Sequence, residues 1–186
     1  MKKIFLMAIA VMMAMADIQA QNIPVGMRME IAESEQDHAE YTIFSYKDDE
    51  NTFGYYLSLG KVTHLLGLIR DDITDAAFDD IKEGCIFLGA TSDEAFATIE
   101  AMIDLMDEDV ETTREFQGRA VTGGERLGGT STSTCVVKKK PLGGKRLQFI
   151  FPSGKRQAEA YITKSIIKEL RNEFKMDKRL HPKQHR

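Results

Sequence analysis

The sequence predicts an α+β fold: an antiparallel-dominated sheet of about seven or eight strands, with two amphipathic helices packed on one face. Three observations predict this fold. Short segments of alternating polar and apolar residues recur between residues 27 and 151. Clusters of glycine, asparagine, aspartate and proline separate them. Two segments carry apolar residues at helical spacing, one starting near residue 92 and the other following residue 154.

A meander of four strands is expected in the first third of the chain. Alternation predicts strands over residues 27–33, 41–46 and 53–59, and a fourth strand over 62–69. Residues 71–83 are acidic and irregular, with one short helix expected around 74–81. A short buried strand then follows over 85–88.

The first of the two helices has the clearest start signal in the chain. Thr91-Ser92-Asp93-Glu94 fits a capping box, in which Thr91 caps the helix and Glu94 stands three residues later. We expect this helix to run to about Asp107. Its apolar residues form a single stripe made of Phe96, Ile99, Ile103 and Met106.

A second meander and a long helix are expected to complete the domain. Strands are predicted over 113–121, 132–139 and 146–151, and Pro152-Ser153-Gly154 ends the last one. The helix is expected from there to about Lys175, because Ala158, Ile162, Ile166, Leu170 and Phe174 are each four residues apart. Residues 177–186 are polar and contain Pro182, which predicts a flexible tail.

The two halves of the chain resemble each other weakly. A shift of 63 residues places Phe87-Leu88 on Ile150-Phe151 and Ile99 on Ile162. Each half then consists of a meander followed by an amphipathic helix. This is consistent with two similar halves, although any strand followed by a helix gives such a pattern.

The first twenty residues have the features of a secretory signal peptide. Lys2 and Lys3 precede 13 apolar residues, a run shorter than the roughly 20 that a membrane-spanning helix requires. We expect cleavage after Ala20, with Ala16 as a second option, and no stable membrane anchor. The sequence thus predicts a protein exported to the periplasm or the extracellular space, with one domain over 21–176.

The net charge limits the classes of partner, and the two cysteines limit the possible disulfides. Without residues 1–20 the chain has 23 basic and 28 acidic residues, a net formal charge of −5, which argues against nucleic acid as the main partner. Cys85 and Cys135 are the two cysteines. They are either bridged by a disulfide, as an oxidising compartment allows, or are two buried thiols in apolar runs.

The expected helices carry rows of opposite charge. The acidic row on the first helix consists of Glu100, Asp104 and Asp107. The basic row on the second consists of Lys164, Lys168, Arg171 and Lys175. Each row is expected opposite its apolar stripe. The rows are either two solvated faces, rims that attract when the helices lie side by side, or surfaces that meet another protein or a second copy.

No motif of a catalytic, metal-binding or cofactor-binding site is present in the sequence. The four histidines are scattered, no HExxH pattern occurs, and no Gly-x-Ser-x-Gly elbow is found. The sequence therefore favours a non-catalytic binding or interaction module with no cofactor. The alternative is a small exported hydrolase whose site combines scattered carboxylates with His64.

Overall fold

The computed structural model describes residues 23–36, 39–61, 83–121, 126–141, 143–153 and 156–182. In these residues eight strands and two helices confirm the predicted α+β fold. The first half contains β1 (Arg28–Gln36), β2 (Ala39–Lys47), β3 (Phe53–Lys61), β4 (Glu83–Gly89) and α2 (Ser92–Leu105). The second half contains β5 (Thr113–Val121), β6 (Thr130–Lys139), β7 (Lys145–Ser153), β8 (Arg156–Thr163) and α3 (Lys164–Leu180).

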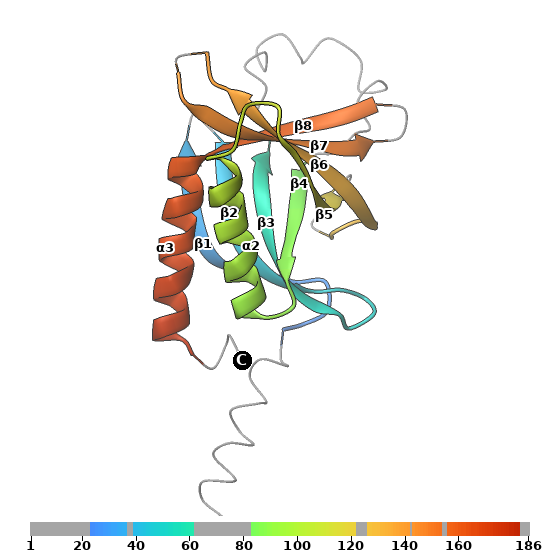
Figure 1. Ribbon diagram of the computed structural model, residues 1–186. Coiled ribbons are helices and arrows are strands. Elements are labelled where there is room, and N and C mark those ends of the chain that lie inside the picture. The colour runs from blue at the N-terminus through green and yellow to red at the C-terminus, as the bar shows by residue number, and fades with distance from the viewer. Residues whose placement is uncertain are drawn as a thin grey trace, which may run out of the picture.

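The eight strands form one sheet in which each strand pairs with its neighbour in the chain. The order runs from β1 to β8, and all seven pairings are antiparallel. Figure 1 shows α2 and α3 side by side on one face of this sheet, as the sequence predicts. We call the face under the helices the inner face and the opposite one the outer face.

The sheet is strongly curved, so its last strand returns toward its first two. In Figure 1, β7 and β8 run across the top of the molecule, while β2, β3 and β4 stand behind the helices. The hydroxyl of Tyr41 on β2 donates to the backbone oxygen of Tyr161 on β8 at 2.9 Å. The curvature brings inner-face residues from both halves, such as Leu57 and Phe149, into one core with both helices. The fold therefore has a single main core.

Helix α2 starts as the sequence predicts. The side chain of Thr91 accepts from the Glu94 amide, and the Glu94 carboxylate accepts in turn from the Thr91 amide, which completes the capping box. Ala95, Ile99 and Met102 are buried against the sheet. Of the predicted apolar stripe, Ile99, Ile103 and Met106 are buried, whereas Phe96 is only partly buried. The helix ends at Leu105, two residues earlier than expected.

The prediction of one long helix after Ser153 is wrong in its first part. Residues Arg156–Thr163 form β8, which pairs with β7, and the helix begins only at Lys164. An apolar spacing of four residues fits a helix, but it is also a multiple of the two-residue strand period. Ile162 therefore faces the core from a strand, whereas Ile166 and Leu170 face it from α3.

The predicted flexible tail also begins too early. Helix α3 continues through Leu180, four residues into the segment expected to be frayed from residue 177. Two contacts stabilise this last turn: Lys178 forms an ion pair with Asp93 at the start of α2, and His181 Nδ1 lies 2.8 Å from Asp177. Lys178 and Arg179 also suit the negative end of the helix dipole.

The element order repeats, but the 63-residue shift is not the structural one. Among the described elements, four strands followed by a helix occur twice. The shift pairs β4 with β7, whereas β8 is the strand that precedes α3. The buried positions that correspond in the two helices are Ala95, Ile99 and Ile103 in α2 with Ile166, Leu170 and Phe174 in α3.

Several predicted features lie outside the described residues. They are the leader over 1–20, the strand over 62–69, the short helix around 74–81 and the last residues of the tail, 183–186. Within the part of the chain that the structure describes, neither helix has the length and apolar character needed to cross a bilayer.

Candidate functional site

The outer face of the sheet brings together the side chains that best fit a functional site. The helices leave this face uncovered, and strand register decides which residues share it. Tyr46 on β2 lies opposite Arg28 on β1, and Arg119 on β5 lies opposite both Cys85 on β4 and Thr130 on β6. Residues far apart in the sequence therefore form one continuous surface.

A second, small hydrophobic cluster lies on the outer face of β2, β3 and β4. Phe44, Tyr46 and Tyr56 are each no more than 2% exposed. The rings of Phe44 and Tyr56 stack with their centroids 5.7 Å apart, and Tyr46 meets Tyr56 edge-on at 6.2 Å. Phe87 and Leu127 pack around this cluster. The aromatic residues of β2 and β3 thus occupy two cores, one on each face of the sheet.

An ion pair links the first strand to the fourth across this cluster. Arg28 Nη1 donates to both carboxylate oxygens of Glu83, at 2.8 and 2.9 Å. The guanidinium carbon lies 4.7 Å from the centroid of the Phe44 ring. Burial by itself lowers the pKa of Arg28, but the hydrogen bond and charge of Glu83 outweigh it and raise that pKa. The Arg28 guanidinium therefore stays charged beside the Glu83 carboxylate.

A second ion pair connects a turn to the fifth strand. Asp48 Oδ1 accepts from the amides of Glu50 and Thr52, which closes the tight turn between β2 and β3. Its other oxygen accepts from Arg119 at 3.0 Å. Burial alone would raise the pKa of Asp48, but these hydrogen bonds and the charge of Arg119 lower it. Arg119 is thereby fixed beside the ring of Tyr56, 5.7 Å from its centroid.

The two cysteines are buried free thiols, so the disulfide considered from the sequence is not formed. They lie on opposite faces of the sheet: Cys85 belongs to the outer cluster, while Cys135 belongs to the main core. Burial raises the pKa of Cys85 well above its usual value and that of Cys135 to about 12. Both sulfurs therefore remain protonated, weak nucleophiles at neutral pH.

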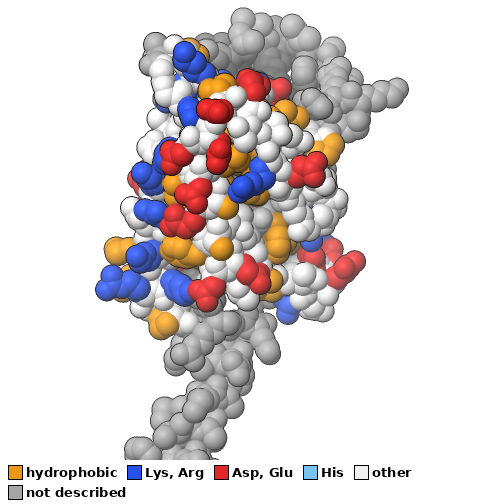
Figure 2. All heavy atoms as spheres, in the orientation of Figure 1, with side chains coloured by type: hydrophobic (Ala, Val, Ile, Leu, Met, Phe, Trp, Pro, Cys, Tyr) orange, Lys and Arg blue, Asp and Glu red, His pale blue; other side chains and the backbone are white. Residues whose placement is uncertain are grey.

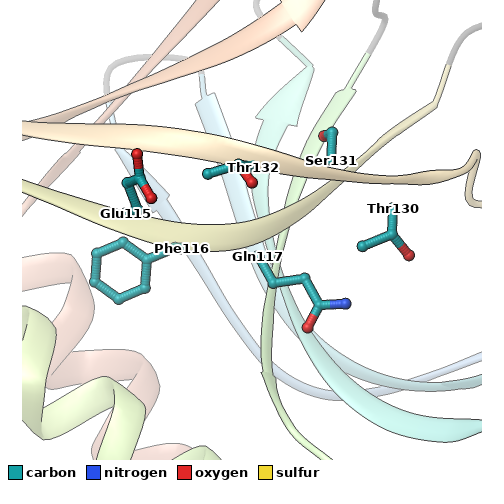
Figure 3. A pocket seen from close by; sticks show the side chains of 6 residues that line it. All are labelled: Glu115, Phe116, Gln117, Thr130, Ser131 and Thr132. Carbon is teal, nitrogen blue, oxygen red and sulfur yellow. The ribbon is translucent and has the colours of Figure 1, made fainter.

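A polar hollow lies beside the ion pairs, where β5 runs next to β6. Its volume is about 440 Å³, and it is lined by Glu115, Phe116, Gln117, Thr130, Ser131 and Thr132. Figure 3 shows the Phe116 ring turned away from Glu115, in keeping with the packing of Phe116 against the main core. The other residues of the lining supply threonine and serine hydroxyls, the Gln117 amide and the Glu115 carboxylate. Such a surface binds polar ligands and disfavours anions.

The outer face of β7 and β8 continues this polar surface. Gln148 Nε2 donates to Glu159 at 2.7 Å and to the Tyr161 hydroxyl at 3.1 Å. The guanidinium of Arg146 lies 3.8 Å from the centroid of the Tyr161 ring. Gln148, Glu159 and Tyr161 thus form a hydrogen-bonded group at this end of the face.

The oppositely charged rows on the helices meet each other within the molecule. Arg171 Nη1 donates to Glu100 at 3.1 Å, and Lys164 forms an ion pair with Asp107. The hydrogen bond from Lys164 is the main cause of the lowered pKa of Asp107. Figure 2 shows the basic side chains along α3 beside acidic ones over α2.

Four of the seven predicted charged residues thus lie at the seam between the helices and not opposite the apolar stripes. Of the alternatives open from the sequence, attraction between adjacent helices accounts for these contacts. Asp104, Lys168 and Lys175 form no ion pair among the described residues. His64, on which the hydrolase alternative depends, lies outside those residues.

Sequence reasoning missed the residues of the outer face. Arg28 and Glu83 are 55 positions apart, and Arg119 and Asp48 are 71 apart. The one available signal was alternation, which places Arg28 and Arg119 on the polar side of their strands. Alternation alone does not identify the strands that neighbour each other in the sheet.

Metal ligation and known relatives give no further assignment for this face. In the described ranges, no three histidine, cysteine, aspartate or glutamate side chains gather to hold a metal ion. No family model, curated protein or solved structure matches the chain. The chemistry of the site therefore has to be argued from its own residues.

Proposed function

We propose that this protein is a small exported binding module without catalytic activity, acting in the periplasm or extracellular space. We further propose that its ligand binds at the hollow of β5 and β6. The observation that carries the proposal is the gathering of Gln117, Thr130 and Thr132 around one hollow on the face that the helices leave uncovered. Ligand sites are typically concave surfaces with a few convergent polar groups.

The lining favours a neutral, hydroxyl-rich ligand such as a short carbohydrate. Threonine hydroxyls and a glutamine amide both donate and accept hydrogen bonds, as sugar hydroxyls do. Glu115 adds a negative charge, and no lysine or arginine lines the hollow, so anionic ligands are disfavoured. The nearby ionisable groups also support a non-catalytic role, because Asp48 and Glu83 are held in ion pairs and the Cys85 thiol is protonated.

Native mass spectrometry of the protein purified after export tests both the cleavage of the leader and the binding of a ligand. We expect a polypeptide beginning at Gln21, and a population carrying a retained small polar ligand. Material that keeps residues 1–20 would contradict export with cleavage, whatever the ligand result.

Binding at the hollow is then tested on an array of neutral oligosaccharides. The double variant Thr132→Val with Gln117→Ala removes a hydroxyl and an amide from the lining. At about 0.5–1.5 kcal/mol for each lost hydrogen bond, binding should weaken by about tenfold. Thr134→Val is the matched control, because Thr134 lies on the same strand and face but does not line the hollow. Equal binding by both variants, or no binding by the wild type, would remove the hollow from the proposal.

A further inference from the structure

The helical layer carries charged side chains of opposite sign at its two ends that form no ion pair among the described residues. Helices α2 and α3 run antiparallel, because Lys164 at the start of α3 pairs with Asp107, and Lys178 near its end pairs with Asp93. The carboxylates of Glu169 and Glu173 are turned toward β1, where they accept from the Ser34 hydroxyl and the Glu33 amide. The charged side chains that remain at each end have no ion-pair partner of opposite charge among the described residues.

The end of α3 carries unpaired positive charge beside exposed apolar side chains. Lys175 and Arg179 form no ion pair among the described residues. Met176 and Leu180, one turn apart, are 59% and 70% exposed. We call Lys175, Met176, Arg179 and Leu180 the basic end.

The opposite end of the layer has the complementary composition. Asp104, Glu108 and Asp109 are exposed, and their carboxylates form no ion pair in the part of the chain that the structure describes. Val110 beside them is 41% exposed. Lys145 binds the backbone oxygens of Asp107 and Glu108, and Lys145 and Lys168 help to lower the pKa of Asp107, so these lysines offset part of the negative charge. We call Asp104, Glu108, Asp109 and Val110 the acidic end.

The two ends cannot neutralise each other within one molecule. The 17 residues of α3 separate them by about 25 Å, at about 1.5 Å per residue. This is several times the screening length of about 8 Å at physiological ionic strength. Three of the five exposed large hydrophobic residues of the described chain belong to these two ends.

We propose that the basic end of one molecule binds the acidic end of a second copy, head to tail. Lys175 and Arg179 then face Asp104, Glu108 and Asp109, while Met176 and Leu180 cover Val110. The contact joins two different surfaces, so it is heterologous and leaves a free end on each copy. Because exposed ion pairs contribute about 0–1 kcal/mol each, the association is weak and depends on salt.

Sedimentation of the purified protein at low and high ionic strength tests this contact. At about 0.01 M salt, where the screening length is about 30 Å, the average mass should keep rising with concentration. At about 1 M salt the association should weaken by at least about tenfold. A wild type that stays monomeric at low ionic strength overturns the proposal, as does a mass that stops rising at the dimer.

Charge reversal identifies the surfaces. Lys175→Glu with Arg179→Glu makes both ends acidic, and Asp104→Lys with Glu108→Lys makes both ends basic. Each double variant alone should be monomeric, whereas their mixture should associate, because one wild-type contact is restored between them. Arg126→Glu reverses an exposed charge that pairs with Asp49, outside both ends, and should associate like the wild type.

Each of the remaining outcomes would show that a second copy of the protein does not bind at the basic and acidic ends. Self-association of either double variant alone, or failure of the correctly folded pair to associate on mixing, overturns the proposal. Binding of the wild type to phosphatidylglycerol vesicles without any self-association would assign the basic end to a membrane surface instead.

Discussion

Gly84 lies where β4 passes directly under the ring of Phe151 in the curved sheet. A β-carbon added at Gly84 would lie 2.4 Å from Cε2 and 2.6 Å from Cζ of that ring. The Phe151 side chain is 1% exposed, so it has no free space into which to move. The absence of a side chain at Gly84 is therefore what allows the strand and the ring to approach so closely.

We expect Gly84→Ala to lower the free energy of unfolding by about 1–3 kcal/mol, because it overpacks the core at Phe151. Urea unfolding followed by circular dichroism measures this loss. Gly129→Ala is the matched control, since a β-carbon there meets nothing within 4 Å, and it should change stability by no more than about 0.5 kcal/mol. Equal losses in the two variants would show that the approach to Phe151 is not the cause.

The side chains of the outer face illustrate what a single sequence leaves open. Arg28 lies in a segment correctly expected to be a strand, whereas Glu83 lies in a segment expected to be irregular and instead begins β4. Their pairing required β1 and β4 to come within reach across two intervening strands. Local alternation fixes the face of a residue but not its distant partner. The hollow depends in the same way on Gln117 lying opposite Thr132, a register that propensities do not specify.

Among the elements, α3 contacts both α2 and the sheet through one aromatic side chain, that of Phe174. Phe174 is fully buried, stacks on Phe96 of α2 at 5.3 Å and meets Tyr55 of β3 at 5.5 Å. The ring therefore joins the two helices and the sheet at a single point.

Phe174→Ala should lower the free energy of unfolding by about 3–5 kcal/mol, the usual cost of removing a buried ring. Thermal and urea unfolding give this value. Met176→Ala lies two residues away on the exposed side of the same helix and should be nearly neutral. A similar loss in both variants would mean that α3 is held by its helical propensity and not by this contact.

The two helices differ in how well the sequence predicts their starts. Helix α2 is predicted correctly because Thr91 and Glu94 form a local signal that needs no tertiary contact. Thr163, which precedes α3, makes no side-chain capping hydrogen bond, so the end of β8 carries no such signal. Ala160, Ile162 and Ile166 continue one even spacing through the change from strand to helix. The pairing of β8 with β7 decides the boundary.

For the molecule as a whole, buried groups that ionise only at alkaline pH determine the highest pH at which the fold is stable. Burial raises the pKa of Cys135 from 9.0 to about 12, that of Tyr55 from 10.0 to about 12, and that of Cys85 in the same direction. Above about pH 9 the unfolded chain therefore loses protons that the folded chain keeps. Since the unfolded state then binds fewer protons, the free energy of unfolding falls as pH rises from about 9 to about 12.

We expect urea midpoints to decrease steadily over that pH window. Cys135→Ala removes one of the titrating groups and should make the decrease shallower, by up to about 1.4 kcal/mol per pH unit. The variant is compared with itself at neutral pH, so its overall loss of stability does not affect the result. Parallel decreases in the variant and the wild type would show that Cys135 does not contribute to the pH dependence.

Helix α3, which packs on the first strand, is synthesised after all the strands that the structure describes. Glu169 and Glu173 of α3 bind Ser34 and Glu33 of β1 across more than 130 residues of chain. While synthesis continues, the inner face of β1 has no cover, and the main core stays incomplete until α3 has emerged. For a chain addressed to export, as we propose, this order of events delays folding. The polypeptide then reaches the translocation pore while it is still unfolded, and an unfolded chain is able to pass through the pore.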